Sequence, residues 1–256
     1  VEDLLQAIKK EKELLIKEKK IKKQKPLPKI TEDEIPFAIP ENWKWVRLGE
    51  VILLNMGQSP NSEDVGNDGI EFHQGKIYFT DEIIGFSDKY CSKPKKISNA
   101  NEILLSVRAP VGEVNLNNRE ICIGRGLASI KIINSEERYF FYLLFYCKKI
   151  FEKKSTGTTF KAISKDIIEN LLIPLPPLAE QKRIVEKLDN VLANIEKLKS
   201  SEEKLSILQK NFPDKLKKSI LQSAIQGKLT EQLATDDNVE DLLQAIKKEK
   251  ELLIKE

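Results

Sequence analysis

The chain begins and ends with the same segment: Val1–Glu18, VEDLLQAIKKEKELLIKE, recurs unchanged as Val239–Glu256. An identical segment of this length does not arise by chance, and its spacing is far longer than the roughly 20 to 50 residues of a solenoid repeat. We therefore expect one unit of a tandem or circular arrangement, cut within a helix. An engineered or recently duplicated sequence is the plainer alternative.

The repeated segment has the pattern of an amphipathic helix, because its apolar residues lie among Lys and Glu without Gly or Pro. This pattern predicts a conserved helix over residues 1–25, repeated at 239–256. Four prolines follow, with the acidic run Thr31–Glu34 between them, and predict an extended linker over 26–35. The prolines are Pro26, Pro28, Pro36 and Pro40.

Residues 36–177 have the texture of a strand-rich domain, with short apolar runs separated by Gly, Asn, Ser and Pro. Two helices are expected inside it, over Arg138–Lys154 and Ser164–Leu171. The fold class predicted is α+β. The runs are Val51–Leu54, Ile77–Phe79, Ile103–Val107, Ile121–Ile123 and Ala128–Ile133.

Residues 178–256 return to a helical pattern after the prolines of Pro174–Pro177. A helix over 178–212 is predicted, about 50 Å long at about 1.5 Å per residue, with Pro213 interrupting it and a further helix over 214–233. Asp236, Asp237 and Asn238 are expected to cap the repeated helix. Alternate spacings of four and three predict a coiled-coil seam through Ile184, Leu188, Val191, Ile195, Leu198, Glu202 and Leu205.

Composition argues against several classes of function. The only histidine, His73, excludes a histidine-based triad or an HExxH zinc site, and it is expected on the surface or in a loop. There is no GxxxxGK[ST] loop and no GxGxxG after a strand. Three cysteines without a CxxC pair predict buried free thiols, and the absence of a long apolar run predicts a soluble, cytoplasmic chain.

Nucleic-acid binding is indicated by the distribution of charge, because the net charge is only +3. Between Pro36 and Pro176 the counts are 18 basic and 17 acidic residues, so any basic face is local. Three windows contain Lys or Arg and no acid, as phosphate contacts require. They are Lys89–Ser98, Ile121–Ile133 and Lys153–Lys165, although scattered solvated lysines would give the same pattern.

Base reading is expected from side chains on turns that can form two hydrogen bonds, and phosphate contacts from Lys, Ser and Thr in the windows. Arg108 has an alternative role in bracing the turn before Pro110, and Gln58 one in capping a strand. The predicted DNA-binding residues are Gln58, Ser59, Asn61, Gln74, Lys76, Lys93, Lys95, Arg108, Arg125, Thr156, Thr158, Thr159 and Lys161. No catalytic or metal-binding residue is predicted.

Six phrases occur in the order seen in the specificity subunits of type I restriction-modification systems, and the chain resembles that family over essentially its whole length. The most specific is PLPPLAEQKRIVEKLD, residues 174–189. The others are IPENWKWVRLGEV (39–51), GQSPN (57–61), ILLSVRAPVGEV (103–114), STGTTFKAI (155–163) and LKKSILQSAIQGKLTEQ (216–232).

The resemblance implies that residues 36–177 are a target-recognition domain and that the helices are conserved regions. Such subunits read the two halves of a split DNA site while antiparallel helices set the spacing and dock the methyltransferase subunits. The family carries two recognition domains, whereas this sequence has one, so a homodimer is expected to restore the pair. The resemblance also implies that S-adenosylmethionine, ATP and Mg belong to the partner modification and restriction subunits, and that this chain holds no cofactor.

Two surfaces are expected to dock partner subunits, around Glu180–Lys187 and Ile220–Leu229, unless they are merely contacts within the chain. Two other classes of function remain. A coiled-coil scaffold would bind protein and show no sequence-dependent DNA binding. A stand-alone DNA-modifying or cleaving enzyme would need a catalytic set that the sequence does not display.

Overall fold

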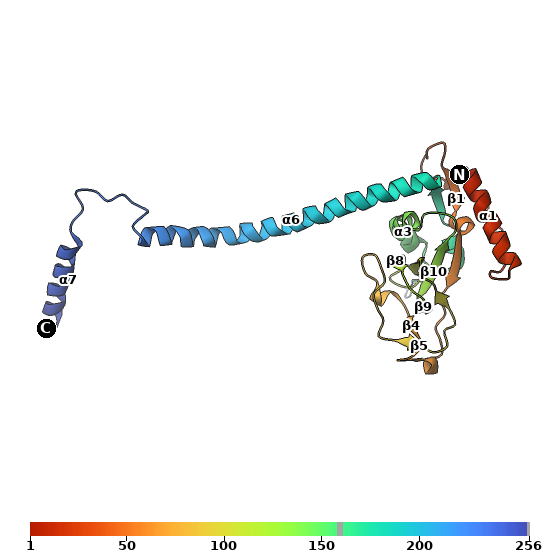
Figure 1. The fold of residues 1–256 in the computed structure, drawn as a ribbon, viewed down its shortest axis with the longest axis horizontal. Coiled ribbons are helices and arrows are strands. Elements are labelled where there is room, and N and C mark those ends of the chain that lie inside the picture. Colours follow the sequence, from red (N-terminus) through yellow and green to blue (C-terminus); the bar gives the residue numbers. More distant parts are fainter. Residues whose placement is uncertain (158–160, 255–256) are drawn as a thin grey trace. The chain divides into compact units, whose positions relative to one another are not determined.

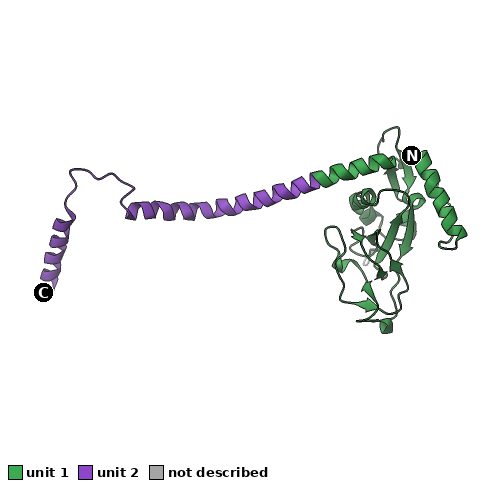
Figure 2. Cartoon of the chain, in the orientation of Figure 1, with its two compact units in different colours: residues 1–190 green, residues 191–256 purple. Residues whose placement is uncertain are grey.

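The computed structural model describes residues 1–157 and 161–254. Its contacts divide the chain into two units, Val1–Asn190 and Val191–Glu256 (Figure 2). Unit 1 contains the strands and unit 2 is helical. None of the helices among the described residues combines the length and apolar content that a membrane crossing requires.

Unit 1 is an α+β fold, as predicted, with its strands in three sheets (Figure 1). The four-stranded sheet has the order β2-β10-β7-β8: Ile52–Met56, Leu127–Ile132, Glu102–Ser106 and Val114–Asn117. The five-stranded sheet has the order β3-β5-β4-β9-β6: Val65–Gly66, Tyr90–Cys91, Ile70–His73, Ile121–Ile123 and Ile97–Ser98. The two-stranded sheet joins β1 (Lys44–Arg47) to β11 (Leu172–Leu175).

Helices cover the four-stranded sheet and bury its apolar face. Helix α3 (Glu137–Tyr146) packs against β7 and β8, and Phe140 on it is fully buried. The short helices α2 (Leu48–Val51) and α5 (Lys165–Glu169) pack together nearby, and 3₁₀ turns occupy Glu32–Glu34, Ser62–Asp64 and Lys76–Tyr78. The three cysteines are buried free thiols, as predicted.

The first helix, α1 (Glu2–Lys17), packs against the rest of unit 1 through its apolar face, where Ile8 is only 1% exposed. Lys12 is also drawn in, with Nζ 2.6 Å from the carbonyl oxygen of Gly49 and 3.2 Å from Oε1 of Gln24. Burial lowers the pKa of Lys12 to about 8, against the attraction of nearby carboxylates. The amide of Gln24 then donates to Glu169, which ties the segment after α1 to α5.

Several element boundaries differ from the predictions. The helix expected over 1–25 ends at Lys17, because Lys19 adopts a positive φ of 55° and the lysines that follow repel one another along a helix. The helix expected over 138–154 is two helices that meet at Cys147, α3 and α4 (Lys148–Lys154). Residues 77–79 are not a strand: Lys76–Tyr78 form a 3₁₀ turn that exposes Ile77, while Tyr78 and Phe79 are partly buried against the core.

The helices predicted over 178–212 and 214–233 are a single helix, α6 (Leu178–Ile225). Pro213 lies inside it, so the prediction that Pro213 ends the helix was wrong. Proline removes one hydrogen bond, but Pro213 and its neighbours are exposed, and water can satisfy the carbonyl left without a donor.

Unit 2 ends in α7 (Val239–Leu253), the repeated segment. Asn238 caps it as predicted, because its side chain accepts from the backbone N–H of Glu240 at 3.1 Å. Ile246, the counterpart of Ile8, is 41% exposed. The seam residues of unit 2, Val191, Ile195, Leu198 and Leu205, are exposed as well.

Candidate nucleic-acid interface

Two of the predicted DNA-binding loops lie side by side because β4 and β9 pair in parallel, with Phe72 opposite Cys122 and His73 opposite Ile123. Parallel strands end at the same edge of a sheet, so the loops after them, 74–76 and 124–126, meet there. The N–H of Gly124 donates to the carbonyl of His73 at 2.8 Å, and the N–H of Gly126 to that of Gln74 at 3.1 Å.

The loop after β2 joins them from the neighbouring sheet. The N–H of Gln58 donates to the carbonyl of Ile123 at 3.1 Å. Ser59 then links all three loops, because its hydroxyl donates to Oε1 of Gln74 at 2.9 Å and accepts from the N–H of Arg125 at 3.3 Å. Gln58, Gln74 and Arg125 all keep exposed side chains at this edge.

Two glycines permit this close approach. A Cβ on Gly57 would lie 2.2 Å from the carbonyl oxygen of Gly124 and 2.6 Å from that of Leu127. A Cβ on Gly124 would lie 2.3 Å from Oε1 and 2.8 Å from Cα of Gln74. Atoms cannot approach so closely, so the loops can meet only where these two positions carry no side chain.

The loop after β7 completes the group. The N–H of Val107 donates to the carbonyl of Gly126 at 2.9 Å, and the N–H of Ala109 donates to that of Lys161 at 3.1 Å. Thr156 and Ala162 exchange two backbone hydrogen bonds of 3.0 Å. We call residues 57–59, 74–76, 108–110, 124–126, 155–157 and 161–162 the loop cluster. Thr158 and Thr159 lie outside the described residues.

Of the charged and polar side chains predicted in the loop cluster, Arg108, Thr156 and Lys161 are exposed. Lys76 is half-buried and forms an ion pair of 3.2 Å with Glu113, which Lys148 also contacts at 2.7 Å. The hydrogen bond from Lys148, followed by that from Lys76, lowers the pKa of Glu113 against burial, which raises it. The charge of Lys76 is therefore paired with Glu113 within the chain.

The other three predicted residues form a neighbouring group. Lys95 donates to Oδ1 of Asn61 at 2.7 Å, and Lys93, 82% exposed on its side chain, lies 3.8 Å from Asp64. This group is tied to the loop cluster through the backbone, because the N–H of Ile123 donates to the carbonyl of Lys96 at 2.9 Å.

The prediction that His73 lies on the surface was wrong, because its ring is fully buried in β4. Its Nε2 lies 2.8 Å from Glu71, which also accepts two hydrogen bonds of 2.7 Å from Arg119 and one of 2.6 Å from the N–H of Ser87. Burial raises the pKa of Glu71, but the bonds from Arg119, Ser87 and His73 outweigh it and lower the pKa to about 2. Burial lowers the pKa of His73, against the pull of Glu71.

The Glu71 network braces β4, the strand that leads into the loop of Gln74, and sequence reasoning missed it. Arg119 closes it by donating also to the carbonyls of Ile84 and Gly85, at 3.1 and 2.8 Å. Only the alternation of Glu71 and His73 along a short apolar run hinted at a buried polar pair.

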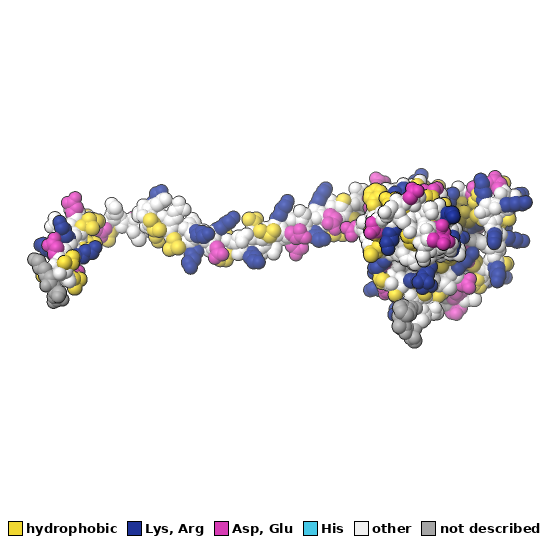
Figure 3. Space-filling view, turned by 90° about the horizontal axis from the view of Figure 1, so that it is seen from below, with side chains coloured by type: hydrophobic (Ala, Val, Ile, Leu, Met, Phe, Trp, Pro, Cys, Tyr) yellow, Lys and Arg dark blue, Asp and Glu magenta, His cyan; other side chains and the backbone are white. Residues whose placement is uncertain are grey.

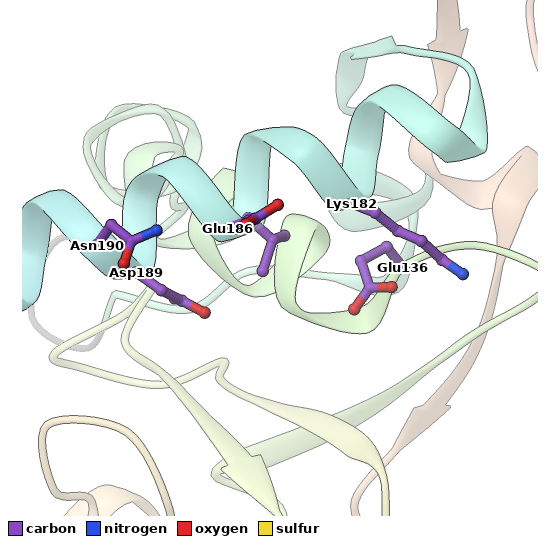
Figure 4. Close-up of a pocket in the computed structure, with 6 residues that line it drawn as sticks. Glu136, Lys182, Glu186, Asp189 and Asn190 are labelled. Atoms are coloured by element: carbon purple, nitrogen blue, oxygen red, sulfur yellow. The ribbon is translucent and has the colours of Figure 1, made fainter.

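A shallow groove lies where α6 begins, lined by Val185 and by the polar side chains drawn in Figure 4: Glu136, Lys182, Glu186, Asp189 and Asn190. Gln181 behind it is fully buried; its Oε1 accepts from the N–H of Glu136 at 2.9 Å, and its Nε2 donates to the carbonyl of Pro176 at 2.9 Å. Within 180–187, Gln181 and Val185 therefore make contacts inside the chain, whereas Lys182, Glu186 and Lys187 are exposed.

Charge on the face seen in Figure 3 is mixed, with Lys and Arg side chains interspersed with Asp and Glu over unit 1. The 18 basic and 17 acidic residues between Pro36 and Pro176 likewise lead us to expect mixed charge. Among the described residues, no group of three His, Cys, Asp or Glu side chains could hold a metal ion.

Comparisons with known proteins agree on one family. Residues 40–206 match the "Type I restriction modification DNA specificity domain". The chain is 39% identical over 199 residues to a putative type I restriction enzyme MjaX specificity subunit of Methanocaldococcus jannaschii, across 75% of this chain and 44% of the relative. It is 30% identical over 217 residues to the EcoAI specificity subunit of Escherichia coli, across 77% of this chain and 36% of the relative.

Solved structures give the same result. The crystal structure of the HsdS subunit from Thermoanaerobacter tengcongensis matches with a TM-score of 0.58 and 41% identity, over 65% of this chain and 41% of that chain. A structure titled as the basis of complex assembly and conformational transition of the type I R-M system matches with a TM-score of 0.62 and 35% identity, over 89% of this chain and 55% of that chain. The chain spans less than half the length of the two curated relatives.

Proposed function

Since the chain belongs to the type I restriction-modification DNA specificity family, we propose that it reads one half of a split DNA sequence and catalyses no reaction itself. The observation that supports this proposal is the loop cluster. Four loops and the segment around Thr156 are fastened to one another by main-chain hydrogen bonds, and they present exposed Gln and Arg side chains at a single edge.

We assign base reading to Gln58, Arg108 and Arg125. Gln pairs with two atoms of adenine, and Arg with two atoms of guanine, in the major groove. Ser59 donates a hydrogen bond to Gln74, so these two residues position the loops, and Lys76 forms an ion pair with Glu113. Phosphate contacts fall to the exposed cations and hydroxyls around them, Lys93, Lys95, Thr156 and Lys161, together with the amide of Asn61.

A second recognition domain, supplied by another copy of the chain, would read the other half-site. Two features support this homodimer. The seam residues of unit 2 are exposed in the single chain and need an apolar partner. Helix α7 exposes the same apolar face that α1 buries on unit 1, so α7 has the side chains to dock on a second recognition domain. A two-fold dimer would prefer a palindromic split site.

Methylation and cleavage would belong to partners. The proposed partners are a methyltransferase subunit that uses S-adenosylmethionine and a restriction subunit that uses ATP and Mg. We place their docking on the exposed side chains Lys182, Glu186 and Lys187 at the start of α6 and on the apolar residues of 220–229. Ile220 and Leu229 are exposed within this second surface.

The test is selection of bound sites from random duplex DNA by the chain together with its methyltransferase subunit, with the mass of the complex measured in parallel. Enrichment of a split palindrome by a dimeric assembly is the expected result. A folded complex that enriches no sequence would overturn the proposal and favour the coiled-coil scaffold. Arg125→Ala should relax one enriched position, whereas Lys9→Ala, a control at an exposed position on α1 outside the loop cluster and both docking surfaces, should leave the enriched sequence unchanged.

A further inference from the structure

A cleft on the outer face of the four-stranded sheet is separate from the loop cluster. Side chains alternate along β2 and β10, so one face of each strand packs into the core, as Ile52 and Ile130 do. The opposite face forms the floor of the cleft, through Leu53, Asn55, Ser129 and Lys131. None of the residues that line it belongs to the loop cluster.

Lysines surround the cleft. Lys20 and Lys165 have acidic partners, Glu18 at 2.8 Å and Glu169 at 3.4 Å. The other three have none in the part of the chain that the structure describes. They are Lys22 from the segment after α1, Lys96 from the residue before β6, and Lys131 from β10.

One carboxylate, that of Glu102, also lines the cleft, and each of its oxygens already accepts a hydrogen bond. Its Oε2 accepts from the hydroxyl of Ser98 at 3.0 Å and its Oε1 from the amide of Asn99 at 3.2 Å. Glu102 is buried, and its single negative charge is outnumbered by the three lysines of the cleft that have no acidic partner among the described residues. The balance of charge at the mouth of the cleft is positive.

A buried hydroxyl marks the floor as incomplete. Ser129 is only 1% exposed, and its Oγ has no hydrogen-bond partner among the described atoms. Leaving a buried hydroxyl unsatisfied costs about 1–3 kcal/mol, so a ligand that accepts a hydrogen bond from it would be favoured here. Asn55, opposite Ser129 in the register of β2 and β10, adds a second polar side chain to the floor.

We infer that this lysine-lined cleft binds a backbone phosphate of duplex DNA, with Lys22, Lys96 and Lys131 supplying charge and Ser129 a hydrogen bond. The inference rests on the proposed function and adds a contact that is independent of sequence. Asn55 lies three residues before Gln58, about 10 Å along the chain at about 3.3 Å per residue. That distance corresponds to roughly three base pairs, so one duplex contacted by the loop cluster is long enough to reach the cleft as well.

The test compares wild type with Lys96→Gln/Lys131→Gln and with Ser129→Ala, each as the full chain in complex with its methyltransferase subunit. Affinity is measured for the enriched duplex and for an unrelated duplex of equal length over a range of salt. Lys9→Gln/Lys10→Gln is the matched control, because these two lysines on α1 are exposed, lie outside the cleft and remove the same charge.

We expect the double cleft variant to bind both duplexes about tenfold more weakly and to lower the slope of log affinity against log salt by roughly 1, without a change in the enriched sequence. Ser129→Ala should weaken both by a similar factor of about three to five, with the slope kept. Unchanged affinity and slope, an effect equal to that of the α1 control, or loss of subunit assembly with DNA binding intact would overturn the inference. The absence of an enriched sequence in wild type would instead overturn the proposed function.

Discussion

Replacing Gly57 by alanine should force the loops of the recognition domain apart. The added Cβ would lie 2.2 Å from the carbonyl oxygen of Gly124 and 2.6 Å from that of Leu127, and both are backbone atoms, one in a loop residue whose N–H is bonded to His73 and one in β10. Overpacking of this kind costs about 1–3 kcal/mol. The alanine also restricts the unfolded chain, which offsets about 0.4–1 kcal/mol. We expect the free energy of unfolding of unit 1 to fall by about 1–2 kcal/mol.

The assay is thermal unfolding followed by tryptophan fluorescence, because both tryptophans, Trp43 and Trp45, lie in unit 1 and report on it rather than on the helices of unit 2. A loss of 1–2 kcal/mol corresponds to a fall in Tm of roughly 2–8 °C. Discrimination between the enriched and an unrelated duplex should drop at least about tenfold, since base-contacting side chains lose their positions.

Gly75→Ala is the matched control. It lies in the loop next to Gln74, its φ of −167° is open to any residue, and a Cβ there meets nothing within 4 Å. Its Tm should stay the same or rise slightly. If the Gly57→Ala and Gly75→Ala variants unfold at the same temperature and discriminate equally between the two duplexes, the close approach of the loops does not require glycine at position 57.

Three further changes test other parts of the structure. Glu71→Gln should lower the free energy of unfolding at pH 7 by about 3 kcal/mol, because Arg119 loses its charge partner. The pKa of Glu71 is about 2 in the folded protein and 4.5 in the unfolded chain, so wild type should lose this contribution as the pH falls from 4.5 to 2. Urea titrations over this pH range should show the loss in wild type and not in the variant. Asn238→Ala should make the first amides of α7 exchange about fivefold faster, for about 1 kcal/mol of lost capping. Pro213→Ala restores a hydrogen bond within α6 and should slow amide exchange over 210–216; unchanged rates would refute the cost assigned to that proline.

Local patterns were enough to predict the class of the fold, but not all of its elements or their bounds. The alternation of a helical segment, a strand-rich segment and a second helical segment gave the α+β class, because periodicity is a property of neighbouring residues. The cap at Asn238 and the burial of the three cysteines followed from side-chain chemistry in the same way. The largest local error, at Pro213, arose because a proline penalty is small beside the many bonds of a long helix.

Long-range pairing could not be predicted. Nothing local to Phe72 and Cys122 indicates that β4 and β9 lie in parallel, yet that pairing brings Gln74 to Gly124. The burial of His73 has the same origin, because Arg119, which completes its network through Glu71, is distant in sequence. The residue types at the predicted interface could be read from the sequence, whereas their proximity depends on sheet topology.

The way the loops are fastened bears on how recognition can change. The bonds that hold the loop cluster run mainly through backbone atoms, such as those from the N–H of Val107 to Gly126 and of Gln58 to Ile123. The side chains of Gln58, Arg108 and Arg125 take part in none of the hydrogen bonds of the described residues that join the loops. Substituting these side chains therefore changes the groups offered to a base while the frame stays closed. Substituting Gly57, Ser59 or Gly124 changes the frame, so it should impair every sequence alike.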